Sequence, residues 1–194
     1  MAFSTPFLKR RRWFRTLLGV LLLLSTSLAR ADSIFVQSVE LTPRDGEYYL
    51  NASFNIGLTP TAREALDRGV ALYFLVEFAL IYPRWYTLYF WNKRVVELQQ
   101  TYRLSFNALT RQYTLSYGVL QQTFYTLENA LSVLGSLSNQ PVFEESLIDE
   151  DRVYEAQLRM RLDTTRLPKP FQIDALGSDR WDVSSSWFRW TFKR

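Results

Sequence analysis

A regular alternation of apolar and polar residues constrains the fold of this chain more than any other feature. In Glu47–Ile56 and Tyr154–Leu162 every even-numbered residue is apolar or aromatic, and every odd-numbered residue carries a polar group. Val96–Asn107 follows the same pattern with a single break at Gln100. Because successive side chains of a strand point to opposite faces, these segments predict strands with one buried and one wet face, which is typical of antiparallel sheets.

Turn residues connect the predicted strands into hairpins. Ile34–Leu41 and Glu47–Ile56 lie on either side of Asp45-Gly46, a pair that adopts the positive φ values of a tight hairpin turn. Val96–Asn107 continues through a short loop into Gln112–Tyr117, which predicts a second hairpin.

Three further segments are predicted strands of other kinds. Val70–Tyr82 is apolar on both faces apart from Glu77, which indicates a strand that is covered on both sides or lies at the centre of a two-layer structure. Arg84–Asn92 is an aromatic strand, and Trp187–Lys193 ends the chain with Phe188, Trp190 and Phe192 on one side.

Two short helices are expected between the strands. Thr59–Gly69 has Pro in its first turn and a glycine as a stop, and Thr126–Gly135 places four apolar residues on one helical face. Asp163–Ser186 is the least regular stretch. We therefore predict one domain over residues 32–194, a mainly β, antiparallel β-sandwich of eight or nine strands, immunoglobulin-like or similar, with two short helices.

Residues 1–31 resemble a cleavable signal peptide. A basic region ends at Arg15, an apolar stretch runs over Leu17–Leu28, and Ala29-Arg30-Ala31 is the small-x-small pattern that signal peptidase accepts. The apolar stretch is shorter than the roughly 20 residues of a spanning helix. We expect cleavage after Ala31, a mature chain in the periplasm, and membrane contact only through an uncleaved leader.

The charge distribution supports export and argues against nucleic acid as a partner. Six of the 23 Lys and Arg residues lie in the leader, so the rest has 17 against 19 acidic residues, a net charge of −2. Arg11-Arg12 also fits a twin-arginine signal, but no cofactor motif follows, and we favour the general secretory route.

The chain has no Cys and no His. This excludes disulfides, thiolate or imidazole metal sites, Cys nucleophiles and every hydrolytic triad that works through His. With only seven Gly there is no phosphate-binding glycine-rich loop either. We predict no catalytic residue, no metal site and no cofactor.

An acidic cluster and an arginine-aromatic group are the remaining candidates for function. The acidic cluster (Glu144, Glu145, Asp149, Glu150 and Asp151) could bind Ca²⁺ or act on glycosides, but a solvated loop is the favoured interpretation. Arg159 and Arg161, on the polar face of one strand, could bind an anionic partner. Trp181 and Trp187 could form an aromatic platform for sugars or for a protein.

Several motifs resemble one exported bacterial family, catalogued as domain of unknown function forty-three-ninety. They cover essentially the whole mature chain: Gly69-Val70-Ala71-Leu72-Tyr73-Phe74, the hairpin from Tyr102 to Tyr113, Leu127-Glu128-Asn129-Ala130-Leu131, Leu167-Pro168-Lys169-Pro170 and Ser186-Trp187-Phe188-Arg189-Trp190. The resemblance implies an envelope-associated protein of Gram-negative bacteria without an assigned activity. It also implies a link to envelope signalling, because members are often encoded beside a membrane sensor kinase.

Three hypotheses of function follow, in order of preference. The first is a periplasmic binding or interaction protein without catalytic activity, whose partner is an envelope or inner-membrane protein such as a sensor kinase. The second is a carboxylate-only enzyme that acts on envelope glycans, and the third is a glycan-binding module with exposed aromatic residues.

Overall fold

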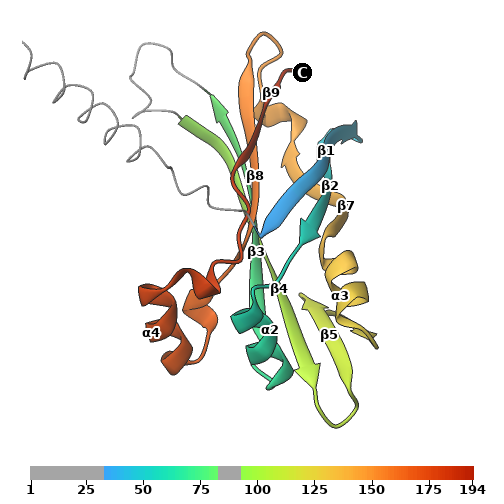
Figure 1. Ribbon diagram of the computed structural model, residues 1–194. Helices are drawn as coiled ribbons and strands as arrows, with labels where there is room; N and C mark the ends of the chain where they lie inside the picture. The colour runs from blue at the N-terminus through green and yellow to red at the C-terminus, as the bar shows by residue number, and fades with distance from the viewer. Residues whose placement is uncertain (1–32, 83–92) are drawn as a thin grey trace, which may run out of the picture. The chain divides into compact units, whose positions relative to one another are not determined.

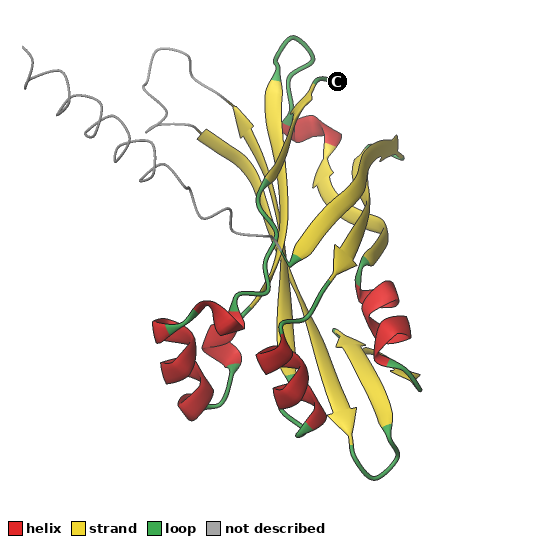
Figure 2. Cartoon of the chain, in the orientation of Figure 1, coloured by secondary structure: helices red, strands yellow, loops and turns green. Residues whose placement is uncertain are grey.

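The computed structural model describes residues 33–82 and 93–194, which form two antiparallel β-sheets and three short α-helices (Figure 1). One sheet has three strands in the order β1-β2-β7, and the other has six in the order β6-β5-β4-β3-β8-β9. The prediction of a mainly β, two-sheet antiparallel fold is therefore confirmed. Figure 2 shows the helices beside the strands.

The six-stranded sheet contains most of the predicted strands. Its members are β3 (Leu72–Tyr82), β4 (Lys93–Asn107), β5 (Gln112–Tyr117), β6 (Leu120–Phe124), β8 (Tyr154–Leu162) and β9 (Phe188–Phe192). β3 lies between β4 and β8, which confirms the central position that its two apolar faces predict. β6 was not predicted, since its five residues show no clear alternation.

The three-stranded sheet is built on the predicted first hairpin. β1 (Ile34–Arg44) and β2 (Glu47–Ile56) are joined by Asp45 and Gly46, whose φ values of 54° and 82° are those of the expected tight turn. β7 (Ser136–Glu144) pairs with the other side of β2 and was missed by the sequence analysis.

One hydrophobic core lies between the two sheets. The even-numbered residues of β2, β3 and β8 face it, and aromatic rings from both sheets meet there. Phe143 of β7 stacks on Tyr48 at 4.8 Å and lies 6.2 Å from Phe78 of β3, measured between ring centroids. Trp190 of β9 packs on the same Phe78 at 6.3 Å.

A short extended segment, residues 182–185, holds the margins of the two sheets together. On one side it bonds to β8, where the Leu162 N–H donates to Val183 at 2.7 Å and the Ser185 N–H donates to Met160 at 2.9 Å. On the other side the Ile34 N–H of β1 donates to Ser184 at 3.2 Å. The backbone of this segment is therefore shared between both sheets.

Two of the three helices were predicted. α2 (Pro60–Asp67) begins after Thr59, whose hydroxyl accepts the Ala62 N–H, and α3 (Leu127–Leu134) is capped in the same way by Thr126. α4 (Lys169–Gly177) was not expected, so the prediction of two helices is one short. Three 3-10 turns complete the structure: η1 (Glu145–Leu147), η2 (Thr164–Arg166) and η3 (Asp179–Trp181).

The predicted signal peptide and the predicted strand Arg84–Asn92 lie outside the described residues. Among the helices that are described, none is both long and apolar enough to span a membrane.

Candidate functional site

The outer face of the six-stranded sheet, which points away from the core, carries one acidic residue at its centre. Glu77 stands on β3 opposite Gln99 of β4 and Arg159 of β8. Its neighbours on the same face of β3, Leu75 and Ala79, are buried, and the Glu77 side chain itself is only 12% exposed. A carboxylate in such a place needs charged partners.

Two arginines of β8 supply these partners. The Glu77 Oε2 atom accepts from Arg159 Nε at 2.7 Å and from Arg159 Nη2 at 2.5 Å. The same oxygen accepts from Arg161 Nε at 3.2 Å. The period-two spacing of β8 places both guanidinium groups on one face, and the strand register brings them to Glu77.

Trp187, the residue directly before β9, is the fourth member of the group. The guanidinium carbon of Arg159 lies 4.3 Å from the centroid of its ring, a cation–π contact. Arg159 is thus held between a carboxylate and an aromatic face. We call these four residues (Glu77, Arg159, Arg161 and Trp187) the Glu77 cluster.

Three of the four binding residues predicted from the sequence therefore meet in one place. Glu77, the fourth member, was not predicted as a site residue, although it is the single acidic residue in an otherwise apolar strand. The cluster has two positive charges and one negative charge on an open sheet face. That composition suits a carboxylate or phosphate group of a partner, which a guanidinium binds through paired N–H donors.

Trp181, the remaining predicted residue, lies inside the domain. It is 2% exposed, its indole N–H donates to Asp174 Oδ2 at 2.8 Å, and Phe171 packs on it at 5.4 Å between centroids. An aromatic platform needs an exposed ring, so Trp181 anchors α4 and η3 to the core and cannot serve as one.

The acidic cluster runs from the end of β7 through η1 to Asp151, and three of its five carboxylates pair with arginines. Arg194 reaches Glu145 at 2.8 Å and Glu150 at 3.2 Å, and Arg152 reaches Asp149 at 2.7 Å. Across the described residues there is no group of three or more acidic side chains placed to hold a metal ion.

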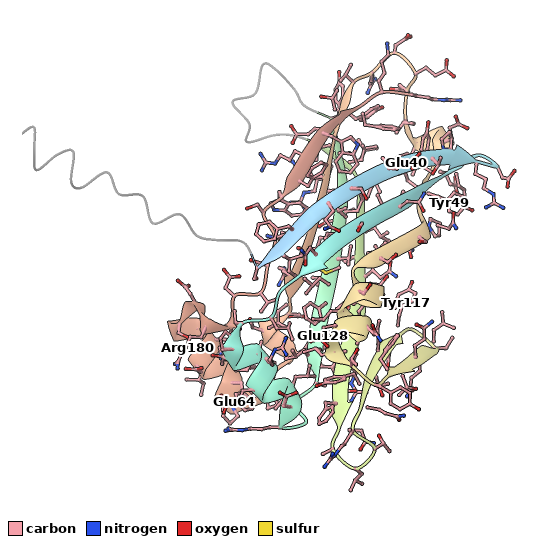
Figure 3. All side chains as sticks on the ribbon, turned by 45° about the vertical axis from the view of Figure 1, so that its right-hand side comes forward. Glu40, Tyr49, Glu64, Tyr117, Glu128 and Arg180 are labelled. Atoms are coloured by element: carbon pink, nitrogen blue, oxygen red, sulfur yellow. The ribbon has the colours of Figure 1, made fainter. Side chains whose placement is uncertain are left out.

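A hollow of about 480 Å³ lies between α2, α3 and the ends of β1 and β2. Its polar lining comes from four separate segments: Gln37, Asn55, Arg63, Glu128 and Ser132. Figure 3 labels Glu128 on α3 and Glu64 on the neighbouring α2. No motif joins these residues in the sequence, so the hollow could not be predicted. It contains a single carboxyl group, whereas glycoside hydrolysis requires two.

Two half-buried tyrosines of the six-stranded sheet, Tyr102 and Tyr113, have raised pKa values. Burial, reinforced by the nearby hydroxyl of Tyr117, raises the pKa of Tyr102 to about 12. Burial also raises the pKa of Tyr113, followed by the effect of the Asp67 carboxylate, which accepts the Tyr113 hydroxyl at 3.2 Å.

The model of the family described as Domain of unknown function (DUF4390) matches residues 31–191. No curated protein and no solved structure matches the chain.

Proposed function

Because the chain belongs to the DUF4390 family, a family of unknown function, we propose its role from its own surface: an exported envelope protein that binds another protein and has no catalytic activity. The proposed binding surface is the outer face of the six-stranded sheet around the Glu77 cluster. Its proposed partner is an inner-membrane protein, with a sensor kinase as the specific candidate.

The observation that carries this proposal is the convergence of Arg159, Arg161 and Trp187 on Glu77. Arginine and tryptophan are the residue types most enriched at the energetic centres of protein interfaces. Here they are fixed by one another, so little side-chain entropy is lost when a partner binds.

The composition around the cluster supports a protein partner with an acidic group. Gln99, Arg103, Gln157 and Arg189 share the outer face with it, as the strand registers show. Glu97 and Glu155 lie on the same face, and each pairs with an arginine, Arg94 and Arg189 respectively. Gln99, Arg103 and Arg189 are exposed, and the hollow between α2 and α3 lies on other elements. Arginine and tryptophan anchors beside exposed polar side chains fit a folded protein partner.

Site-specific photo-crosslinking in cells tests the proposal. A photoreactive amino acid at Gln99, which is exposed beside Glu77, should capture one inner-membrane protein. The same probe at Glu40, exposed on β1 of the other sheet, should not capture it. N-terminal sequencing of the probe-carrying chain in the crosslinked product should begin at Asp32, as expected for export and cleavage.

Two variants separate binding from folding in this assay. Trp187→Ala and Arg161→Gln should lower the yield of the crosslink about fivefold, the effect of losing roughly 1 kcal/mol of binding free energy. Arg68→Gln is the matched control and should have no effect, because Arg68 directly follows α2 and its side chain is 72% exposed. Equal capture at both probe positions, or an unchanged yield in both cluster variants, would remove this face from the proposal.

Glycan binding is the second candidate, and the hollow between α2 and α3 is the observation that favours it. Its volume of about 480 Å³ lies in the range of small-molecule sites, and its polar side chains can bond to sugar hydroxyls. Calorimetric titration with envelope glycan fragments should show binding that Arg63→Gln abolishes. No heat of binding for the unmodified protein would eliminate this candidate.

A further inference from the structure

β6 differs from the other strands at the edges of the two sheets. An exposed edge strand invites pairing with another chain, and proteins usually protect such edges with charges or proline. β1 contains Glu40, Pro43 and Arg44, β7 contains Pro141 and Glu144, and β9 contains Arg189. β6 contains none of these residue types, and the whole stretch 112–127 has no charged residue.

The backbone of β6 is free to pair along its outer side. β5 and β6 are joined by Gly118 and Val119, and Gly118 has a φ of 54°, so Tyr117 and Leu120 form the bonded pair that closes the hairpin. The even-numbered residues of β6 therefore bond to β5. Gln121 and Thr123 point their N–H and C=O groups outward, and in the described part of the chain no strand lies on that side.

Two rows of side chains cross the inner face of the sheet and stop at this edge. They are Tyr102–Tyr117–Leu120 and Phe106–Tyr113–Phe124. In the first row the ring centroids of Tyr102 and Tyr117 are 5.0 Å apart, and in the second row those of Phe106 and Tyr113 are 4.8 Å apart. Both rows are therefore packed up to β6. There Leu120 is 66% exposed, and Tyr117, labelled in Figure 3, is 36% exposed.

We propose that β6 pairs with β6 of a second copy of this chain, antiparallel, about a two-fold axis at Gln122. The two six-stranded sheets would then form one continuous sheet. This dimer is independent of the partner surface proposed above, since the Glu77 cluster lies on β3, on β8 and at the residue before β9.

The sequence of β6 is complementary to itself in this register. Gln122 meets its own copy, and Leu120 meets Phe124 of the second chain. Gln121 meets Thr123 of the second chain, and these are the two residues whose N–H and C=O groups point outward, so each such pair exchanges two backbone hydrogen bonds. Apolar residues meet apolar residues and polar residues meet polar ones.

The pairing also joins the two rows across the dimer. The row that ends at Leu120 in one chain continues into the row that begins with Phe124 in the other. Because the strand meets an identical strand about a two-fold axis, no free β6 edge is left and the assembly closes at two chains. A strand without charged residues is prone to unwanted pairing when its edge is open. A contact between two identical strands favours such a strand, because equal charges would face each other across the two-fold axis.

A cysteine at the two-fold axis tests the register directly, since the natural chain has no Cys. Two Cys side chains at position 122 would face each other as a non-bonded pair, close enough for a disulfide. Full-length protein produced in cells with Gln122→Cys should migrate as a dimer on a non-reducing gel after mild oxidation. Gln99→Cys, equally exposed in a strand but distant from the edge, is the control and should remain monomeric.

Charge substitution at the same position tests the equilibrium. Gln122→Lys and Gln122→Glu each place like charges opposite one another, so each should weaken dimerisation at least tenfold in sedimentation experiments. An equimolar mixture of the two variants should restore the dimer. Because the Gln122 side chain is exposed, neither change should alter the circular dichroism spectrum.

Each outcome decides the proposal. Selective crosslinking at position 122 together with rescue in the mixture supports it. A protein that is monomeric over the whole concentration range, a dimer unaffected by either charge, or equal crosslinking at 99 and 122 would overturn it. Crosslinking of Gln122→Cys to a different protein only would assign the edge to another partner and also overturn it.

Discussion

Replacement of Glu77 by Gln removes the charge on which the Glu77 cluster is built while keeping the shape of the side chain. The amide oxygen can still accept one N–H, but it cannot neutralise two guanidinium groups. Arg159 and Arg161 would remain on the sheet face, 28% and 33% exposed, without their counter-ion. We therefore expect the substitution to destabilise the fold.

The magnitude follows from the three contacts that the carboxylate makes. A hydrogen bond to a charged group contributes about 1.5–3 kcal/mol to stability. Because the two arginines are partly exposed, the contribution of each contact here is expected near or below the lower end of that range. One contact survives in the amide, so the expected loss is about 2 kcal/mol in the free energy of unfolding. For a domain of this size that lowers Tm by roughly 4–8 °C.

Urea unfolding followed by circular dichroism measures this loss, and the chain offers a close control. Glu97 lies on the same sheet and pairs with Arg94 at 2.7 Å, but the two side chains are 46% and 58% exposed. Glu97→Gln should change stability by less than about 0.5 kcal/mol. A double-mutant cycle of Glu77→Gln with Arg159→Gln should give a coupling energy of about 1–2 kcal/mol. If both Glu variants lose less than about 0.5 kcal/mol, the buried ion pair makes no net contribution and the reasoning is wrong.

Three further predictions concern the rest of the fold. Gly135→Ala should lower the free energy of unfolding in urea by several kcal/mol, because the added Cβ would lie 2.3 Å from the carbonyl oxygen of Phe54. The control Gly177→Ala should be neutral, because its Cβ would meet no atom within 4 Å. Equal effects of the two substitutions would contradict this prediction. Trp181→Ala should cost about 3–5 kcal/mol, measured the same way, and a loss below about 1 kcal/mol would show that the ring is not buried in solution. The pKa of Tyr102 in the folded protein is about 12, above its ordinary value of 10. The contribution of the neutral Tyr102 side chain to the free energy of unfolding is therefore complete below pH 10 and is lost as the pH rises toward 12. When the pH is raised from about 8 to about 11, the free energy of unfolding of Tyr102→Phe should therefore fall less than that of the unmodified protein. Parallel curves of the free energy of unfolding against pH would refute the assignment.

Where one face of a strand is buried, the sequence was enough to place it. β2, β5 and β8 begin and end at the predicted residues, because burial of a single face imposes strict alternation on the side chains. The hairpin turn at Asp45-Gly46 could be predicted for a different reason, since few residue pairs adopt its positive φ values.

The elements that were missed lack these constraints. β7 has irregular register against β2, a positive φ at Asn139 and a proline, which together erase its period. α4 has no buried residue and therefore no apolar stripe. Pro170 in its first turn was the one available sign of a helix start, and it was interpreted as part of an irregular stretch.

The candidate site could be predicted only in part. Alternation placed Arg159 and Arg161 on a wet face, but it could not show that Glu77 lies beside them, because strand order and register depend on tertiary pairing. Trp181 was misplaced for a related reason: its burial comes from α4 and η3, whose packing leaves no periodic pattern in the sequence.

The segment that bonds to both sheets has a consequence for how the protein is made. Ser33 at the start of β1 bonds to Asp182 and to Ser184, residues 149 and 151 positions further along the chain. A chain synthesised from its N-terminus can form the β1–β2 hairpin early, but the hydrogen bonds that residues 182–185 make to both sheets form only after these late residues are present. A chain that ended before residue 182 would leave the margins of both sheets open, ready to pair with strands of other proteins.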